Sequence, residues 1–254
     1  MKIAVLLRPV PDPVEELELS DDGTDLDRDF LGYVLNEFDD HALEEALLLK
    51  DETGAEVSVW ALGTADEVDQ ILYTALAKGA DRACKLGDDL GALDSRAQAT
   101  LFADALGDEA PDLILTGVQA ADELVGQVAV LVASALDLPH VEVVVGTEPV
   151  DGGIRVTKEF WGGITGDYQV ALPAVLGIQA AREAPRYVAV SRVRQAQQEG
   201  NLEERDVTAP DPAPGVKVVE MRIPEAGEGA EMIEGDEAAA ADAIVEILRR
   251  AGVA

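Results

Sequence analysis

Cysteine and histidine are scarce in this sequence. Its 254 residues include one cysteine, Cys84, and two histidines, His41 and His140. A single cysteine excludes a disulfide within the chain and any cysteine-rich metal cluster, and the two histidines lack the spacing of a zinc site. Neither histidine has the sequence context of a nucleophile–base pair. The sequence therefore argues against self-contained catalysis of the zinc-dependent or Ser-His-Asp type.

Basic residues are also few. Lysine and arginine total 19 against 51 aspartate and glutamate residues, which gives a formal net charge of −32. Such a surface repels the phosphates of nucleic acids and of acidic membranes. An acidic composition can indicate disorder, but a mean hydropathy of +0.06 and clear apolar periodicity contradict that alternative. We interpret the charge as the adaptation of a folded, halophilic protein to high salt, which screens it.

Aromatic residues and long apolar runs are missing as well. Aromatic residues form 4% of the chain and hydrophobic residues 48%, so the core must consist mainly of valine, leucine, isoleucine and alanine. No apolar run reaches the roughly 18 residues of a membrane span. The apolar stretch that ends at Leu7 is too short, and too soon followed by Pro9 and Pro11, for a signal peptide. We expect it to be a first strand, and the protein to be cytoplasmic.

Strand and helix patterns alternate over residues 1–137. Residues 24–33 are expected to be irregular. Four strand–helix units predict an α/β fold with a doubly wound, mainly parallel sheet. Ligands of such sheets bind beyond the carboxyl ends of the strands, which here are the segments after Leu7, Leu62 and Thr116. The predicted strands are 2–7, 56–62, 83–86 and 112–116, and the predicted helices are 40–50, 66–77, 95–106 (capped by Asp94 or Ser95) and 123–136.

The pattern changes at His140. Strand-like runs at 140–145, 154–158, 168–172 and 174–179, with Gly-Gly turns between them, predict added antiparallel strands. We expect an α/β domain over residues 1–184, a partner-docking segment and linker over 185–215, and a C-terminal arm over 216–254. Within the arm, 216–221 is predicted to be a strand, 225–237 to be flexible and 236–251 to be an amphipathic helix.

One segment with the features of a ligand site precedes a predicted helix. Asn36 and Asp39 are expected to cap this helix, and a helix N-terminus suits a phosphate or the edge of a nucleotide. From these residues alone, an ordinary N-cap is the alternative.

A second such segment, 116–129, follows a buried strand and enters a helix. Gly117 and Gly126 would let the backbone approach a ligand, and Asp122 and Gln127 supply polar groups. The segment has neither a GxGxxG pattern nor a Walker phosphate loop. An ordinary strand-to-helix loop remains the alternative.

A basic segment follows at residues 185–198. It contains Arg186, Arg192 and Arg194 and no acidic residue. In a chain of net charge −32, a neutral-to-basic and partly apolar segment favours docking to another protein. An internal patch of salt bridges is the alternative.

A series of short motifs, in the same order along residues 1–198, resembles the electron transfer flavoprotein β-subunit family. Together the ordered motifs are far more specific than any one of them. They are Arg8-Pro9-Val10-Pro11-Asp12; Asn36-Glu37-Phe38-Asp39 with Ala42-Leu43-Glu44-Glu45-Ala46; Leu62-Gly63 with the stretch from Thr74 to Arg82; Gly117-x-Gln119-Ala120-x-Asp122 with Gly126-Gln127-Val128; Lys158-Glu159-x-x-Gly162-Gly163; Leu172-Pro173-Ala174-Val175; and Pro185-Arg186-Tyr187.

The resemblance implies an adenine nucleotide α-hydrolase-like fold and an α subunit that carries most of an FAD site. It implies that this chain is an electron carrier rather than an enzyme, with a structural AMP and with electrons passing from acyl-CoA or other dehydrogenases to a membrane quinone reductase. Val190 would be an apolar anchor for dehydrogenases, with Arg192 and Arg194 beside it. The implied nucleotide contacts are Leu6, Asn36, Glu37, Phe38, Asp39, Leu62, Gly63, Gly117, Val118, Gln119, Ala120, Ala121, Asp122, Gly126, Gln127 and Val128.

The chain departs from the family pattern at two places. Many members have Thr-Gly after the loop glutamine, where this chain has Val128-Ala129, which weakens one expected phosphate contact. The lysine run after the anchor is replaced by 194–198. Three alternatives therefore stay open: an electron-bifurcating relative with a second FAD in this chain, a nucleotide-binding module without redox partners, and an ATP-hydrolysing enzyme of the same fold. The last would need a Ser-Gly-Gly-x-Asp-Ser loop that is absent here.

Overall fold

A computed structural model describes residues 1–28, 31–123, 126–210, 218–224, 229 and 232–253. Within these residues the core is a nine-stranded sheet of order β11-β5-β4-β1-β6-β10-β7-β8-β9, and β2 and β3 form a separate pair. The strands are β1 (Lys2–Leu7), β2 (Pro9–Pro11), β3 (Tyr33–Leu35), β4 (Glu56–Leu62), β5 (Arg82–Leu86), β6 (Leu113–Gly117), β7 (His140–Val150), β8 (Gly153–Glu159), β9 (Thr165–Ala171), β10 (Ala174–Ile178) and β11 (Leu202–Arg205).

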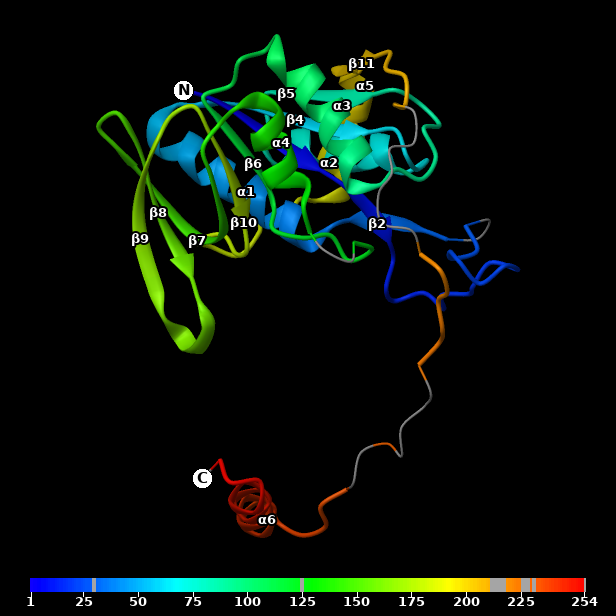
Figure 1. Ribbon diagram of the computed structural model, residues 1–254, viewed down its shortest axis with the longest axis vertical. Coiled ribbons are helices and arrows are strands. Elements are labelled where there is room, and N and C mark those ends of the chain that lie inside the picture. Colours follow the sequence, from blue (N-terminus) through cyan, green and yellow to red (C-terminus); the bar gives the residue numbers. More distant parts are fainter. Residues whose placement is uncertain (29–30, 124–125, 211–217, 225–228, 230–231, 254) are drawn as a thin grey trace.

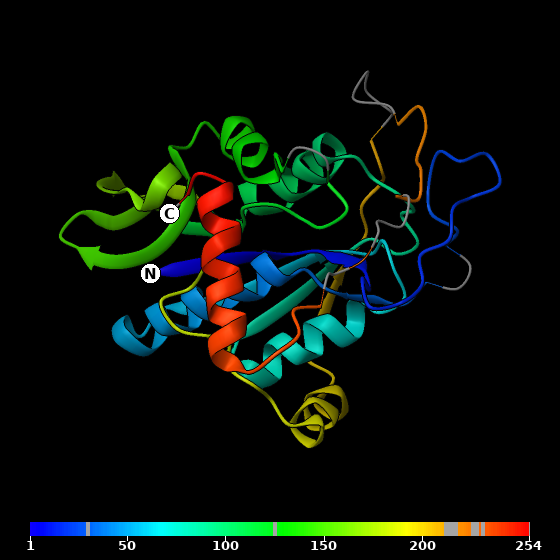
Figure 2. The same cartoon turned by 90° about the horizontal axis from the view of Figure 1, so that it is seen from below.

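Helices cover both faces of this sheet, as a continuous apolar strand such as β1 requires. Helices α1 and α2 pack on one face, and α3 and α4 pack on the other (Figures 1 and 2). The arrangement confirms the predicted α/β fold with a mainly parallel sheet. The helices are α1 (Glu37–Thr53), α2 (Val68–Lys78), α3 (Ser95–Gly107), α4 (Val128–Leu136), α5 (Val190–Glu199) and α6 (Glu237–Arg250), with a short 3-10 turn η1 (Trp161–Gly163).

One strand was predicted with the wrong direction, and another was not predicted. Strand β10 was predicted to be antiparallel, but it lies between β6 and β7 and is parallel to both. Strand β11 was not predicted, and it extends the other edge by pairing in parallel with β5. Both errors concern pairings between segments far apart in the sequence, which local periodicity does not encode. The antiparallel order of β7, β8 and β9 was predicted correctly.

Several predicted boundaries also need correction. Helix α4 begins at Val128 rather than residue 123, and α1 begins at Glu37 rather than residue 40. Residues 33–35, part of which was expected to be irregular, form β3. The strand predicted at 216–221 is absent from residues 218–221, and its first two residues lie outside the described residues. Of the segment predicted to be flexible, 225–237, residues 225–228, 230 and 231 also lie outside them.

The C-terminal helix α6 stands apart from the sheet (Figure 1). It has no buried residue, although its sequence is amphipathic, and Ile244, Val245, Ile247 and Leu248 remain partly exposed. Among the described residues, no helix combines the length and the apolar character that are needed to cross a membrane. The apolar side chains of α6 are not buried against any other element of the described residues.

Candidate functional site

The main cavity of the described residues lies at the carboxyl edge of the parallel strands and has a volume of about 1080 Å³. Its walls come from the ends of β1 and β4, the starts of α3 and α4, the loop after β6, and residues 218–221 of the C-terminal segment. This volume suits a ligand of nucleotide size or larger. Residues that line it include Leu7, Arg8, Leu62, Thr64, Ser95, Arg96, Gln98, Ala120, Ala121, Asp122, Glu123 and Gln127.

The cavity sits where the winding of the sheet reverses. Strand β1 lies between β4 and β6, and the chain builds outward from β1 through β4 to β5 before it returns to β6 on the other side. The loops that leave β1 and β6 therefore turn toward opposite faces and open a crevice between them. The three segments that the sequence analysis selected, after Leu7, Leu62 and Thr116, all meet there.

The start of α4 faces this cavity without the groups that normally neutralise a helix N-terminus. Its N-cap residue, Gln127, makes no side-chain capping bond, and its first turn has no acidic residue. By contrast, the first turn of α1 contains Glu37, Asp39 and Asp40. Free N–H groups and the positive end of the helix dipole can bind an anion. In this acidic chain, the start of α4 is therefore a suitable place for a phosphate.

Asn36 and Asp39 do not act as the helix caps that the sequence predicted. Asn36 occupies the N-cap position of α1 but makes no side-chain capping bond. Its side-chain amide instead donates to the carbonyl of Gln119 at 2.9 Å. Asp39 is fully buried and accepts from the backbone N–H of Gly117 at 2.7 Å. Both side chains therefore brace the loop after β6, because tertiary partners compete with local capping.

Arg8 links this loop to the rest of the site. Its guanidinium contacts Asp39 and Glu123, each at 2.8 Å, and donates to the carbonyl of Gly117 at 3.1 Å. Burial alone lowers the pKa of Arg8, but the carboxylates, above all Asp39, more than offset this effect and raise it. Glu123 also accepts from the hydroxyl of Ser95 at 2.8 Å. The sequence analysis named Arg8 as part of a family motif but did not assign it to the site. Its position directly after a buried strand could have indicated that it belongs there.

The predicted nucleotide contacts fall into two groups. The first lines the cavity and consists of Leu62, Ala120, Ala121, Asp122 and Gln127. The second does not line it. Members of this second group form the strand ends, loop backbone and helix starts around the cavity: Leu6, Asn36, Glu37, Phe38, Asp39, Gly63, Gly117, Val118, Gln119, Gly126 and Val128.

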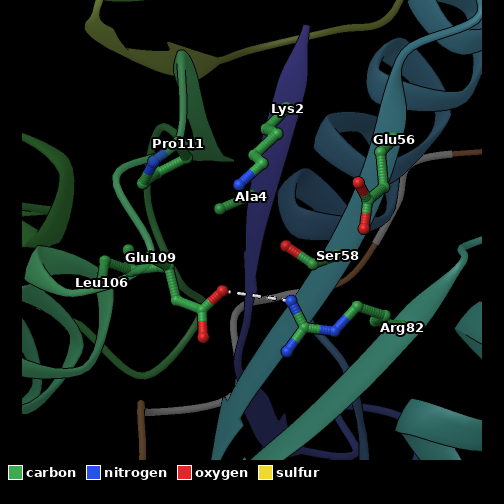
Figure 3. A pocket seen from close by; sticks show the side chains of 8 residues that line it. All are labelled: Lys2, Ala4, Glu56, Ser58, Arg82, Leu106, Glu109 and Pro111. Atoms are coloured by element: carbon green, nitrogen blue, oxygen red, sulfur yellow. Dashed lines mark hydrogen bonds and ion pairs between the residues drawn. The ribbon is translucent and has the colours of Figure 1, made fainter.

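The opposite, amino edge of the sheet has only a small cavity of about 70 Å³ (Figure 3). Charged side chains from several strands surround it, and Arg82 pairs there with Glu109 at 3.1 Å. A space of this size holds a few water molecules rather than a nucleotide. The small cavity is therefore not a candidate ligand site.

A separate buried carboxyl group lies on β7. Both oxygens of Glu142 are buried and have no hydrogen-bond partner within the part of the chain that the structure describes. They pack over Gly177 of β10, where a Cβ atom would lie 1.8 Å from one of them. The next residue, Val143, has a φ of 64°, which is rare for a β-branched side chain. Burial raises the pKa of Glu142 to about 7, and the charges of Lys158 and Arg8 only partly oppose this effect.

We expect the pKa of Glu142 to make the protein less stable as pH rises from about 4.5 to about 7. Between these values the folded state binds a proton that the unfolded state has lost, so each increase in pH favours unfolding. The glutamine of Glu142→Gln cannot ionise. The free energy of unfolding of this variant should therefore exceed that of the wild type by about 1–3 kcal/mol at pH 8 but by little near pH 5. Urea denaturation at both pH values measures this difference. Glu148→Gln, at an exposed position, is the control, and an equal effect of Glu142→Gln at both pH values would contradict the prediction.

The basic segment 185–198 combines features of an internal patch of salt bridges with features of a docking surface, and different residues carry each. Arg186 pairs with Glu44 at 2.9 Å and with Asp51 at 3.1 Å, so it belongs to an internal patch of salt bridges. Arg192 and Arg194, on α5, are exposed and have no ion-pair partner among the described residues. Val190, the first residue of α5, is 61% exposed. Val190 and Arg194, about one helical turn apart, lie on the same exposed side of α5, and Arg192 lies on a different side.

Comparisons with known proteins point to one family. The family model described as the electron transfer flavoprotein domain matches residues 26–210. The chain is 36% identical to the electron transfer flavoprotein subunit beta of Methylophilus methylotrophus, with 98% of each chain covered. It is 32% identical to the protein of the same name from Syntrophomonas wolfei, with 98% of this chain and 96% of the relative covered. The Bacillus subtilis protein of that name is 28% identical, with 98% of each chain covered.

Proposed function

The chain belongs to the electron transfer flavoprotein β-subunit family, and from this premise we propose that it binds AMP in the main cavity and completes the FAD site of an α subunit. In this role it carries electrons and neither makes nor breaks bonds in a substrate. The cavity at the point where the sheet winding reverses, with the uncapped start of α4 in its wall, is the observation that carries the proposal.

The AMP phosphate would bind at the start of α4, where free N–H groups and the helix dipole favour an anion. Gln127 is the polar side chain next to this position. The adenosine would lie against the ends of β1 and β4, where Leu7 and Leu62 provide apolar surface, with Asp122 on the opposite wall. A carboxylate in this position can accept hydrogen bonds from ribose hydroxyls.

Two exposed apolar surfaces support a heterodimer. At the turn between β8 and β9, Trp161 is 96% exposed and Ile164 is 64% exposed. The second surface is the apolar side of α6, which buries none of its residues. Apolar surfaces of this kind mark contacts with other proteins. We propose that the α subunit covers both of them.

The exposed side chains of α5 would receive the electron donor. Val190 offers an exposed apolar side chain, and Arg192 and Arg194 add positive charge to an otherwise acidic surface. Apolar anchors flanked by charge favour rapid, specific and reversible docking. In this proposal the donor is an acyl-CoA dehydrogenase or another dehydrogenase, and the acceptor is a membrane quinone reductase.

The size of the cavity favours one further candidate, a second FAD in place of AMP. The volume of about 1080 Å³ is slightly above the roughly 300–1,000 Å³ range of ligand pockets and leaves room for a dinucleotide. An electron-bifurcating relative would use the cavity in this way.

Nucleotide analysis of the purified heterodimer separates these functions. We expect co-expression with the α subunit to give a complex that contains one FAD and one AMP, identified by chromatography after denaturation. Two flavins and no AMP would instead support the bifurcating form. A chain that purifies without an FAD-binding partner would contradict the proposed electron-carrier role.

A further inference from the structure

We propose that Arg8 is a positioning residue for the nucleotide phosphate: it holds the loop after β6 in the shape that lets a phosphate reach the start of α4. This role rests on the proposed function, because it concerns the same cavity. Arg8 directly follows β1, and its side chain is only 5% exposed. Burial of a guanidinium costs free energy unless its N–H groups find partners. The partners of Arg8 therefore indicate which parts of the structure it holds together.

The contacts of Arg8 hold both ends of the loop 117–123. At the first end, its guanidinium donates to the carbonyl of Gly117, and Asp39 accepts from the N–H of the same glycine. At the other end it pairs with Glu123. Asp39 in turn accepts from the backbone N–H and the Nε of Arg8, at 2.9 Å and 3.0 Å. One side chain therefore sets the distance between the two ends of the loop.

Glu123 extends this arrangement to α3. Its carboxylate accepts from the hydroxyl of Ser95 at 2.8 Å and from the N–H of Ala120 at 3.2 Å. Ser95 is the first residue of α3, and both Ser95 and Ala120 line the cavity. The loop, α3 and β1 are thus fixed to one another through a single buried ion pair. The segment that follows Glu123 leads directly to the start of α4.

Charge explains why this residue must be a cation, and shape explains why it must be an arginine. Asp39 and Glu123 carry negative charge near a cavity that would receive a phosphate, and Arg8 compensates both. A lysine at this position would keep the charge but present a point donor, which cannot match the planar fork that contacts two carboxylates and a carbonyl. Arg8→Lys therefore tests geometry at constant charge.

Arg82 provides a matched control for Arg8. It also pairs with two carboxylates, those of Glu109 and Glu203. The Arg82–Glu109 pair lies beside the small cavity at the amino edge of the sheet (Figure 3). Neither Arg82 nor its two partners line the main cavity. Arg82→Lys makes the same chemical change without touching the loop after β6.

The test measures AMP and adenosine binding by calorimetry on the heterodimer after its nucleotide has been removed. We expect Arg8→Lys to weaken AMP binding by about tenfold or more and adenosine binding by about threefold or less, because displacement of the loop mainly affects the phosphate. Arg82→Lys should bind both within about twofold of the wild type. Equal losses of AMP and adenosine affinity in Arg8→Lys, or no loss of either, would overturn the positioning role.

A second variant keeps the test decisive if Arg8→Lys does not fold. Ser95→Ala removes one of the other contacts of the Glu123 carboxylate, at a partly exposed position, and leaves the buried ion pair with Arg8 intact. We expect it to weaken AMP binding by about threefold or more, with adenosine binding little changed; unchanged AMP binding would count against the inference. If the wild-type heterodimer binds neither AMP nor adenosine, the proposed function itself has failed, which is a different result from the failure of the Arg8 role.

Discussion

Asp39→Ala should lower the free energy of unfolding by about 3–5 kcal/mol, because it leaves a buried charge without its main partner. Asp39 is fully buried and accepts from the Arg8 guanidinium and from the N–H of Gly117. Its removal takes away one of the two carboxylate partners of the Arg8 guanidinium and leaves two backbone donors, the N–H groups of Arg8 and Gly117, without this acceptor. Denaturation with urea, in wild type and variant under the same salt conditions, measures the loss.

Glu148→Ala is the control for this prediction. Glu148 pairs with Arg155 at 2.6 Å, but the two side chains are 62% and 50% exposed. Ion pairs in such positions contribute about 0–1 kcal/mol, because water already solvates both charges. If Asp39→Ala were no more destabilising than Glu148→Ala, the buried network around Arg8 would not be a major source of stability.

Gly117→Ala should destabilise the fold by about 3 kcal/mol or more, because the site has no room for a methyl group. A Cβ atom at Gly117 would lie 2.5 Å from the Cβ of Phe38 and 2.6 Å from both the Phe38 carbonyl carbon and Asp39 Oδ1. Backbone atoms are among these neighbours, so rotation of a side chain cannot relieve the contact. The start of α1 and the end of β6 would have to separate.

The same measurement on Gly107→Ala tests whether space is the reason. Gly107 is the last residue of α3, and no atom lies within 4 Å of a Cβ built there. Alanine is favoured over glycine in a helix, so this variant should be neutral or more stable by up to about 1 kcal/mol. We also expect Gly117→Ala to lose AMP from the purified heterodimer, while Gly107→Ala should retain it.

Local patterns in the sequence were enough to predict most of the elements that form the sheet and its helices. Strands β1 and β4 were predicted to the residue, because buried parallel strands are continuous apolar runs. The end of α2 at Lys78 was signalled by Gly79, which adopts a φ of 128°. The N-cap of α3 was narrowed to two residues, and the structure selects Asp94, whose side chain accepts from the N–H of Ala97.

The sequence by itself determined the class of fold and the family, and it predicted the carboxyl edge as the place of the candidate site, because each depends on local periodicity or on the order of motifs. Only the tertiary structure decided that β10 lies parallel between β6 and β7, that α4 starts late at Val128, and that Asp39 and Arg8 meet across 31 residues of chain. These features arise from pairings between distant segments. No local preference encodes them. The carboxylate of Asp39 could cap a helix, but it binds the buried guanidinium of Arg8 instead, because folding brings the two together.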